Sequence, residues 1–292
     1  MTEPTGRPLI PASAPSMIER MTIVLESFDA ASPRLSLAEL VERTGLPRST
    51  VHRILEKLVE LRWLDHRSGT YGLGMRSLEL GGLAVANNEL RDVATPHLYA
   101  LHQRTGLVAH LSILDRRDVV VLDKVGGAVA GTVPTRVGGR TPAHATADGK
   151  AILAWTDSRQ VDAMYRERLP SRTPRTLTSL EMLRRELALV RQRGGVAWDR
   201  EEAWAGVSTV AAPLRGTGRA IGALSVSGDA RQVRFERLAP LVTEAAREAS
   251  VALFPSEPKP RRRRTGLEPE PSPWPEGALD RLIEGIGGDY WL

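Results

Sequence analysis

Cysteine is absent from this chain of 292 residues. Its absence excludes a disulfide framework, a cysteine nucleophile and a thiolate metal site, and it fits a protein of the reducing cytoplasm. The sequence also lacks any apolar run of about 18 residues, so no segment is expected to span a membrane. Residues 1–15 are rich in proline and serine and lack the apolar stretch of a signal peptide. We expect them to be a disordered lead-in.

The composition is that of a folded protein. Hydrophobic residues make up 41% of the chain, which is enough for ordinary cores, and the length accommodates two domains. The net charge of +5 is compatible with nucleic-acid binding. A GC-rich coding sequence, which favours arginine, alanine, glycine and proline, would explain the same charge without a nucleic-acid partner.

The N-terminal region has the pattern of a winged helix-turn-helix. Apolar residues recur at helical spacing over 16–29, and a capping-box pattern at Ser36–Glu39 opens a short helix that a glycine ends. The stretch 45-GLPRSTVHRILEKL-58 predicts another helix, beginning near its proline. The stretch 62-RWLDHRSGTYGLG-74 predicts two strands around a Ser68-Gly69 turn. Helix, short helix, tight turn, helix and hairpin is the order of this fold.

The helix within GLPRSTVHRILEKL is the candidate for reading DNA, because the second helix of a helix-turn-helix places its N-terminal residues against base edges. Arginine pairs bidentately with guanine, and hydroxyl groups suit phosphates or base edges. With Val51, Ile54 and Leu55 on the core side, the DNA-contacting candidates are Arg48, Ser49, Thr50, His52 and Arg53, together with Arg67 in the wing. The alternative is a solvated helix face in which Ser49 is only an N-cap and His52 only packs beside the turn.

Helical patterns continue to about residue 104, and beyond it the apolar spacing alternates as in strands. Helices are expected over 74–87, 90–104, 148–154, 158–168, 178–193 and 232–253, and strands over 107–114, 119–125, 131–137, 196–199, 206–214 and 219–227. Strands mixed with helices predict an α+β fold in which helices cover a sheet. Residues 255–292 are rich in proline and arginine, with Arg261–Arg264 in a row, and are expected to form a disordered tail.

A small-ligand pocket is predicted in the second half of the chain. Ser225 and Ser227 face the same side of one strand, and two hydroxyls on an otherwise apolar strand suit a small polar ligand in a mostly apolar pocket. No catalytic constellation is apparent. His110 and His144 have no partner at ligand spacing, so no metal site is expected. The acidic run 199–202 is more typical of a solvated or ion-paired loop than of acid–base catalysis.

Several stretches together resemble the IclR family of bacterial transcription regulators. They are GLPRSTVHRILEKL, YGLG at the end of the wing, RTPAHATADGKAILA, WDREEAWAGVSTVAAPL and GALSVSG, in the family's order. The resemblance implies a winged helix-turn-helix over 16–76, a linker helix over 77–89 and a GAF-like α/β effector-binding domain over 90–254. It also implies dimers or tetramers that bind palindromic operators in double-stranded DNA.

The same resemblance implies an effector pocket formed by Ala147, Asp148, Asp199, Thr209, Ser225 and Ser227. Two of these positions depart from the family's pattern: Thr209 stands where cysteine is frequent, and Asp148 where a small residue is common. An acidic group at that position disfavours an anionic ligand unless it is capped or paired.

Two functions follow from these patterns. The first is a cytoplasmic DNA-binding transcriptional regulator controlled by a small-molecule effector, with repression as the commoner mode among similar proteins. The alternative is a metabolite-binding or hydrolytic protein whose N-terminal domain serves only dimerisation. Residues 16–76 carry nine basic and eight acidic side chains, a net charge of +1. Because so small a charge gives little non-specific affinity for DNA, two or more copies are expected to bind together.

Overall fold

The computed structural model describes residues 15–29, 31–86, 88–166 and 168–254. The predicted tail over 255–292, with its arginine run, and residues 1–14 of the predicted lead-in lie outside the described residues. Within the described part of the chain, no helix is both long and apolar enough to cross a membrane.

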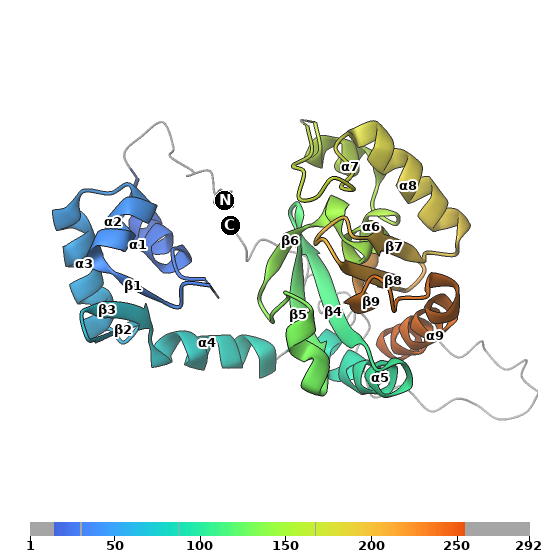
Figure 1. Cartoon of the computed structure of the whole chain (residues 1–292), viewed down its shortest axis with the longest axis horizontal. Helices are drawn as coiled ribbons and strands as arrows, with labels where there is room; N and C mark the ends of the chain where they lie inside the picture. Colours follow the sequence, from blue (N-terminus) through green and yellow to red (C-terminus); the bar gives the residue numbers. More distant parts are fainter. Residues whose placement is uncertain (1–14, 30, 87, 167, 255–292) are drawn as a thin grey trace, which may run out of the picture. The chain divides into compact units, whose positions relative to one another are not determined.

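The N-terminal part forms the predicted winged helix-turn-helix (Figure 1). Its helices are α1 (Met17–Glu26), α2 (Leu37–Thr44) and α3 (Arg48–Glu60), and its strands are β1 (Arg34–Ser36), β2 (Leu64–Arg67) and β3 (Thr70–Leu73). The strands pair antiparallel in the order β1-β3-β2. The sequence did not predict β1, since a strand of three residues is too short to show an alternating pattern. Apolar side chains from all three helices and all three strands meet in one core.

Local signals explain the boundaries of these elements. Ser36 and Glu39 form the predicted capping box at the start of α2, and Gly45 ends the helix with a φ of +64°. The hairpin turn between β2 and β3 uses Ser68 and Gly69, both with positive φ. Two consecutive residues of positive φ match the right-handed twist of paired strands. The predicted hairpin and the predicted start of α3 are confirmed.

Two helices follow the wing, α4 (Met75–Ala86) and α5 (Glu89–Thr105). Asn88 caps α5 by accepting a hydrogen bond from the backbone N–H of Arg91, and Gly106 ends it in the left-handed conformation. The two helices differ in burial. The α5 helix contributes Ala94, Leu98 and Leu101 to the core, whereas α4 buries no residue.

The second half of the chain is built on a six-stranded antiparallel sheet in the order β6-β5-β4-β9-β8-β7 (Figure 1). Its strands are β4 (Val108–Asp115), β5 (Asp118–Val125), β6 (Arg140–Pro142), β7 (Ala197–Arg200), β8 (Val207–Arg215) and β9 (Ala220–Asp229). The strand predicted over 131–137 is wrong. Its place is taken by the end of a 3-10 helix, η1 (Gly127–Thr132), and an irregular segment, because Pro134 has no N–H to donate to a strand ladder. The short edge strand β6 was missed.

Helices cover both faces of this sheet, as the α+β pattern predicts (Figure 1). On one face α5 and α9 (Phe235–Leu253) enclose an apolar core. On the other face lie the 3-10 turn η2 (Ala143–Ala145) and three helices, α6 (Ala147–Leu153), α7 (Ser158–Met164) and α8 (Leu180–Gln192). The α8 helix is capped by Ser179, which accepts from the N–H of Met182. The helix expected from residue 178 therefore begins slightly later than predicted, at Leu180.

The α6 helix lies unusually close to the backbone beside it. Its alanines Ala147 and Ala151 pack against Ala211 and Ala223 of the sheet, and all four are fully buried. A Cβ at Gly149 would collide with the backbone of Ala143. Glycine at this position allows the start of α6 to sit against η2, and this contact fixes where the neighbouring side chains point.

We predict that Gly149→Ala destabilises the fold by roughly 1–3 kcal/mol or more, because the added methyl forces α6 away from η2. Gly82→Ala in α4 is the matched control, since nothing lies near the added methyl there. That control should stabilise its helix by about 1 kcal/mol, because alanine is the better helix former. Differential scanning calorimetry of the full chain measures both changes. A Gly149→Ala protein as stable as the parent would contradict the predicted collision.

Candidate functional site

The N-terminal half of α3 has two distinct faces. Val51, Ile54 and Leu55 are buried in the core. Among the predicted DNA-contacting residues of α3, Arg48, Ser49, His52 and Arg53 are exposed and Thr50 is half-buried. The N-cap residue is Pro47, which makes no side-chain capping bond, and the first turn holds no acidic residue. The interpretation of Ser49 as an N-cap is therefore wrong, and the helix start has no side chain that would compete with a phosphate.

Two of the predicted DNA-contacting side chains have partners on the protein. Nδ1 of His52 lies 3.5 Å from a carboxylate oxygen of Glu56, one turn further along α3. Arg67 in the wing lies 3.1 Å from Asp65 and its side chain is 78% exposed. Asp65 also binds Arg34 at 2.7 Å, so it holds two arginines at the base of the wing. Surface pairs of this kind are weak, and a phosphate can displace the carboxylate from Arg67.

A cavity lies on the sheet face covered by α6. It encloses about 20 Å³, which is room for roughly one water molecule. Antiparallel pairing sets Asp199 of β7 opposite Thr209 of β8, and Thr209 opposite Ser227 of β9. The Thr209 and Ser227 hydroxyls are 2.9 Å apart. These three side chains form one row across the sheet, and Asp148 faces the same cavity from the first turn of α6.

The cavity brings together four of the six residues predicted for the effector pocket: Asp148, Asp199, Thr209 and Ser227. The other two do not line it. Ala147 packs in the apolar core between α6 and the sheet. Ser225 is fully buried, and its hydroxyl acts on the carboxyl of Asp148.

Sequence reasoning missed most of the other residues that line the cavity. The additional lining residues are His110, Ser112, Val119, Val121, Thr135, Thr141, Thr146 and Trp204. His110 and Ser112 are two residues apart on β4 and hence face the same side. The same pattern that identified Ser225 and Ser227 was present at these two positions, and could have found them.

Burial sets the protonation state of the titratable groups in the cavity. Burial, with Lys124 nearby, lowers the pKa of His110 to about 3, so this imidazole is neutral, and its Nε2 lies 2.8 Å from the hydroxyl of Thr135. Burial raises the pKa of Asp199 to about 7, although Lys150 opposes the rise. Burial also raises the pKa of Asp148 to about 6, against the effect of the Ser225 and Ser112 hydroxyls.

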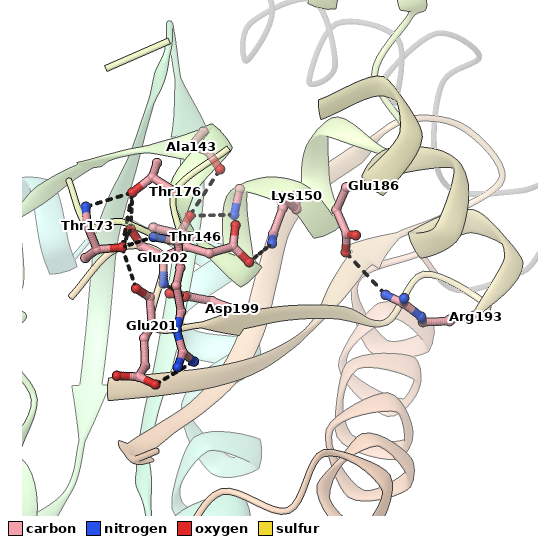
Figure 2. Close-up of polar contacts among 12 residues, drawn as sticks. Ala143, Thr146, Lys150, Thr173, Thr176, Glu186, Arg193, Asp199, Glu201 and Glu202 are labelled. Carbon is pink, nitrogen blue, oxygen red and sulfur yellow. Dashed lines mark hydrogen bonds and ion pairs between the residues drawn. The ribbon is translucent and has the colours of Figure 1, made fainter. Parts of the chain in front are cut away.

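A buried ion pair connects α6 to the loop after β7 (Figure 2). Lys150 is 1% exposed, and its ammonium lies 2.6 Å from a carboxylate oxygen of Glu202. The backbone N–H of Glu202 donates to Asp199 at 2.6 Å. From the other side, the hydroxyls of Thr173 and Thr176 donate to the carbonyls of Glu201 and Glu202, each at 2.7 Å. The loop that carries Trp204 into the cavity is thus fixed from two directions. Within the described residues, no three His, Asp or Glu side chains are grouped as metal ligands.

We predict that the Asp148→Asn variant becomes more stable than the parent protein as the pH rises. The folded pKa of Asp148 is about 6 against about 4 in an unfolded chain, so the parent protein loses stability between about pH 4 and pH 6, where the unfolded chain releases a proton that the folded carboxyl keeps. The stability difference between variant and parent should grow by on the order of 2 kcal/mol between pH 4 and pH 7.5. Urea unfolding across this range measures it.

Asp162→Asn serves as the control for this prediction. Asp162 is paired with Arg184, and its pKa is lowered by that pairing, so neutralising it brings no gain at high pH. A stability difference for Asp148→Asn that does not change with pH would refute the assignment of a buried, titrating carboxyl.

Comparison with known proteins identifies both halves of the chain. The IclR helix-turn-helix domain model matches residues 18–68, and the model of the bacterial transcriptional regulator IclR C-terminal region matches residues 82–253. The chain is 35% identical over 240 residues to the HTH-type transcriptional regulator XynR of Escherichia coli, covering 81% of this chain and 94% of that protein. It is 29% identical to the acetate operon repressor of Salmonella typhimurium, covering 78% and 86% of the two chains.

Solved structures agree with these matches. An IclR homologue from Microbacterium hydrocarbonoxydans, solved in complex with 4-hydroxybenzoate, superposes with a TM-score of 0.72 at 31% identity, covering 82% of this chain and 100% of that one. IclR of Thermotoga maritima gives a TM-score of 0.65 at 28% identity, covering 81% and 98%. The family models together cover α3, the first strand of the wing and the residues that line the cavity. This chain belongs to the IclR family of bacterial transcriptional regulators.

Proposed function

We propose that this regulator binds a palindromic operator through α3, and that a small effector in the cavity beside α6 modulates the binding. The observation that carries the DNA-binding part is the two-faced N-terminal half of α3, with apolar residues locked in the core and arginine and hydroxyl side chains exposed. Relatives named as repressors support repression as the mode of action. A regulator of bacterial operons acts in the cytoplasm, and we propose that location for this chain.

In this proposal each DNA-contacting residue has a distinct role. Arg48 and Arg53 read base edges in the major groove, where arginine pairs with guanine. Ser49 and Thr50 bind phosphate at the helix start, where backbone N–H groups also favour an anion. His52 contributes to base contact when it leaves Glu56. Arg67 exchanges Asp65 for a phosphate beside the wing.

We further propose that the chain acts as a homodimer or a higher homo-oligomer. The α4 helix buries none of its residues, although several of them are apolar. The side chains of Met75, Leu78 and Leu80 are 56%, 68% and 45% exposed. Apolar side chains on an uncovered helix favour association with a second copy. Two reading helices on one palindrome also compensate for the near-neutral charge of each N-terminal domain.

The proposed domain limits follow the chain's elements. Residues 16–76 form the DNA-binding domain, 77–89 the linker helix and 90–254 the effector domain. The proposed effector site comprises the cavity residues Asp148, Asp199, Thr209 and Ser227, whereas Ser225 and Ala147 are buried and do not line the cavity. The family's character as regulators favours this function over the hydrolytic alternative.

We predict that Arg53→Ala weakens operator binding about tenfold or more, because each good arginine–guanine pair contributes roughly 1–3 kcal/mol. Lys57→Ala is the matched control on the same helix, since it removes the same charge from a side chain paired with Glu60 beyond the reading positions. Fluorescence anisotropy with the intergenic DNA upstream of the gene, at 150 mM salt, measures both. Equal losses in the two variants, or binding without sequence preference, would argue against base reading by α3.

We predict that Leu78→Asp in α4 shifts the protein toward monomers, because a buried carboxylate at the interface is costly. Met182→Asp on α8 is the control, since Met182 is 45% exposed and lies outside α4. Sedimentation velocity over a concentration series reads out the assembly state. If the two variants assemble like the parent protein, α4 is not the interface.

A further inference from the structure

A segment beside the cavity is held in place mainly by side chains. We call residues 127–137 the strap, which lies between β5 and β6 and includes η1. Its residue Thr135 lines the cavity and Val133 is 2% exposed, whereas the rest of the strap is exposed or half-buried. Within the described residues, no backbone–backbone hydrogen bond joins the strap to the sheet. Such bonds begin only at Gly138, which donates to the carbonyl of Val121.

Two side chains of the sheet connect it to the strap. The ammonium of Lys124 on β5 donates to the carbonyls of Val133 and Thr135, at 3.0 and 2.6 Å. On β4, Nε2 of His110 lies 2.8 Å from the hydroxyl of Thr135. His110 and Lys124 are directly opposite each other where β4 pairs with β5, so both side chains lie on the same face of the sheet. Because hydrogen bonds from a charged donor are stronger than neutral ones, Lys124 is the principal attachment of the strap.

Glycine pairs stand at both ends of the strap. They are Gly126 with Gly127, and Gly138 with Gly139. Gly127 and Gly138 have φ of +47° and +73°, in the left-handed region that glycine enters without a steric penalty. Residues at the ends of a moving segment absorb the changes in φ and ψ that its movement requires. The two glycine pairs therefore allow the strap to swing while β5 and β6 stay in the sheet.

The other segment beside the cavity, the loop that carries Trp204, is held more firmly. The buried ion pair of Lys150 with Glu202 fixes it to α6, and the hydroxyl of Thr176 donates to its backbone at 2.7 Å (Figure 2). Trp204 packs against a small apolar cluster that contains Val133 of the strap. The strap thus rests beside a fixed neighbour, and it can move without breaking a buried ion pair.

The size of the cavity requires such a movement, because about 20 Å³ holds roughly one water molecule and no larger effector. We propose that the strap is the gate of this cavity: it swings about its two glycine pairs, and Lys124 is the latch that holds it closed. An entering effector displaces the strap and breaks the two hydrogen bonds of the latch. This inference rests on the proposed function in one respect, since that function makes the cavity an effector site.

A single cysteine in the cavity tests the gate, because the chain has none of its own. Thr209 lines the cavity and is 5% exposed, so the thiol of Thr209→Cys reacts only when the cavity opens. The probe is methyl methanethiosulfonate, and mass spectrometry of the full chain measures the labelling rate. In the Thr209→Cys background, Lys124→Met should speed labelling about tenfold or more, since two hydrogen bonds from a charged donor are lost. Thr135→Val, which removes the hydroxyl beside His110, should speed it roughly fivefold.

Two controls separate the gate from other routes to the thiol. Thr176→Val removes a hydrogen bond from the loop that carries Trp204 and leaves the strap intact, so labelling of Thr209→Cys should not change. Ala249→Cys places a thiol in the core on the opposite face of the sheet, where a fully buried side chain reacts only on unfolding. Lys124→Met should speed labelling of Thr209→Cys about tenfold more than labelling of Ala249→Cys.

The proposal is overturned if Lys124→Met speeds labelling of both thiols equally, if it changes neither rate, or if Thr176→Val speeds labelling as much as Lys124→Met does. Should Lys124→Met fail to fold, unchanged labelling in Thr135→Val overturns it. Failure of the proposed function looks different, because labelling requires neither DNA nor effector. If no compound that alters operator affinity slows the labelling of Thr209→Cys, the cavity is not the effector site, although the strap remains its gate.

Discussion

The buried ion pair between Lys150 and Glu202 is the interaction on which the cavity depends. An ammonium group that is 1% exposed is tolerated only with a partner, and the carboxylate at 2.6 Å is that partner. Removing one member of such a pair typically costs about 3–5 kcal/mol, because the other charge stays buried. The pair fixes the loop after β7 to α6. That loop presents Trp204 to the cavity, and its backbone N–H satisfies Asp199.

The polar groups that line the cavity lower the stability of the fold. Burial raises the pKa of both Asp148 and Asp199 toward neutrality, so ionising either group is unfavourable in the folded state. An apolar cavity on the same sheet face would be more stable. The opposite face, packed with α5 and α9, shows that this sequence builds such a core readily. This contrast supports the proposal that the carboxyl and hydroxyl groups gathered at one point of the face serve to bind an effector, and a bound ligand would recover part of their cost.

The sequence predicted the features that local signals control. The capping box at Ser36 and the Ser68-Gly69 turn each depend on a few neighbouring residues, and both were found. Ser225 and Ser227 were placed on one face because a strand alternates strictly. What failed depends on distant parts of the chain. The segment 131–137 has residues that favour a strand, apart from its proline, but no strand of the sheet pairs with it. The short edge strands β1 and β6 form because a longer strand offers them a partner.

Protonation was the least predictable property of the site. His110 could be placed on a strand, but its low pKa comes from complete burial and from Lys124 on the neighbouring strand. A sequence does not distinguish an exposed aspartate from a buried one such as Asp148. Only the packing of α6 against the sheet distinguishes them, because that packing buries the carboxyl of Asp148 and so raises its pKa.

The absence of buried residues in α4 also bears on how far the protein can reach along DNA. A helix of 12 residues is about 18 Å long, and the same segment fully extended spans up to roughly 40 Å. An isolated helix of this length is marginal in water, and Gly81 and Gly82 weaken it further. In the assembly that we propose, packing by a second copy therefore does more than hold two chains together. It sets the length of the connection between each DNA-binding domain and its effector domain. That length in turn determines which operator spacings the assembled protein can bridge.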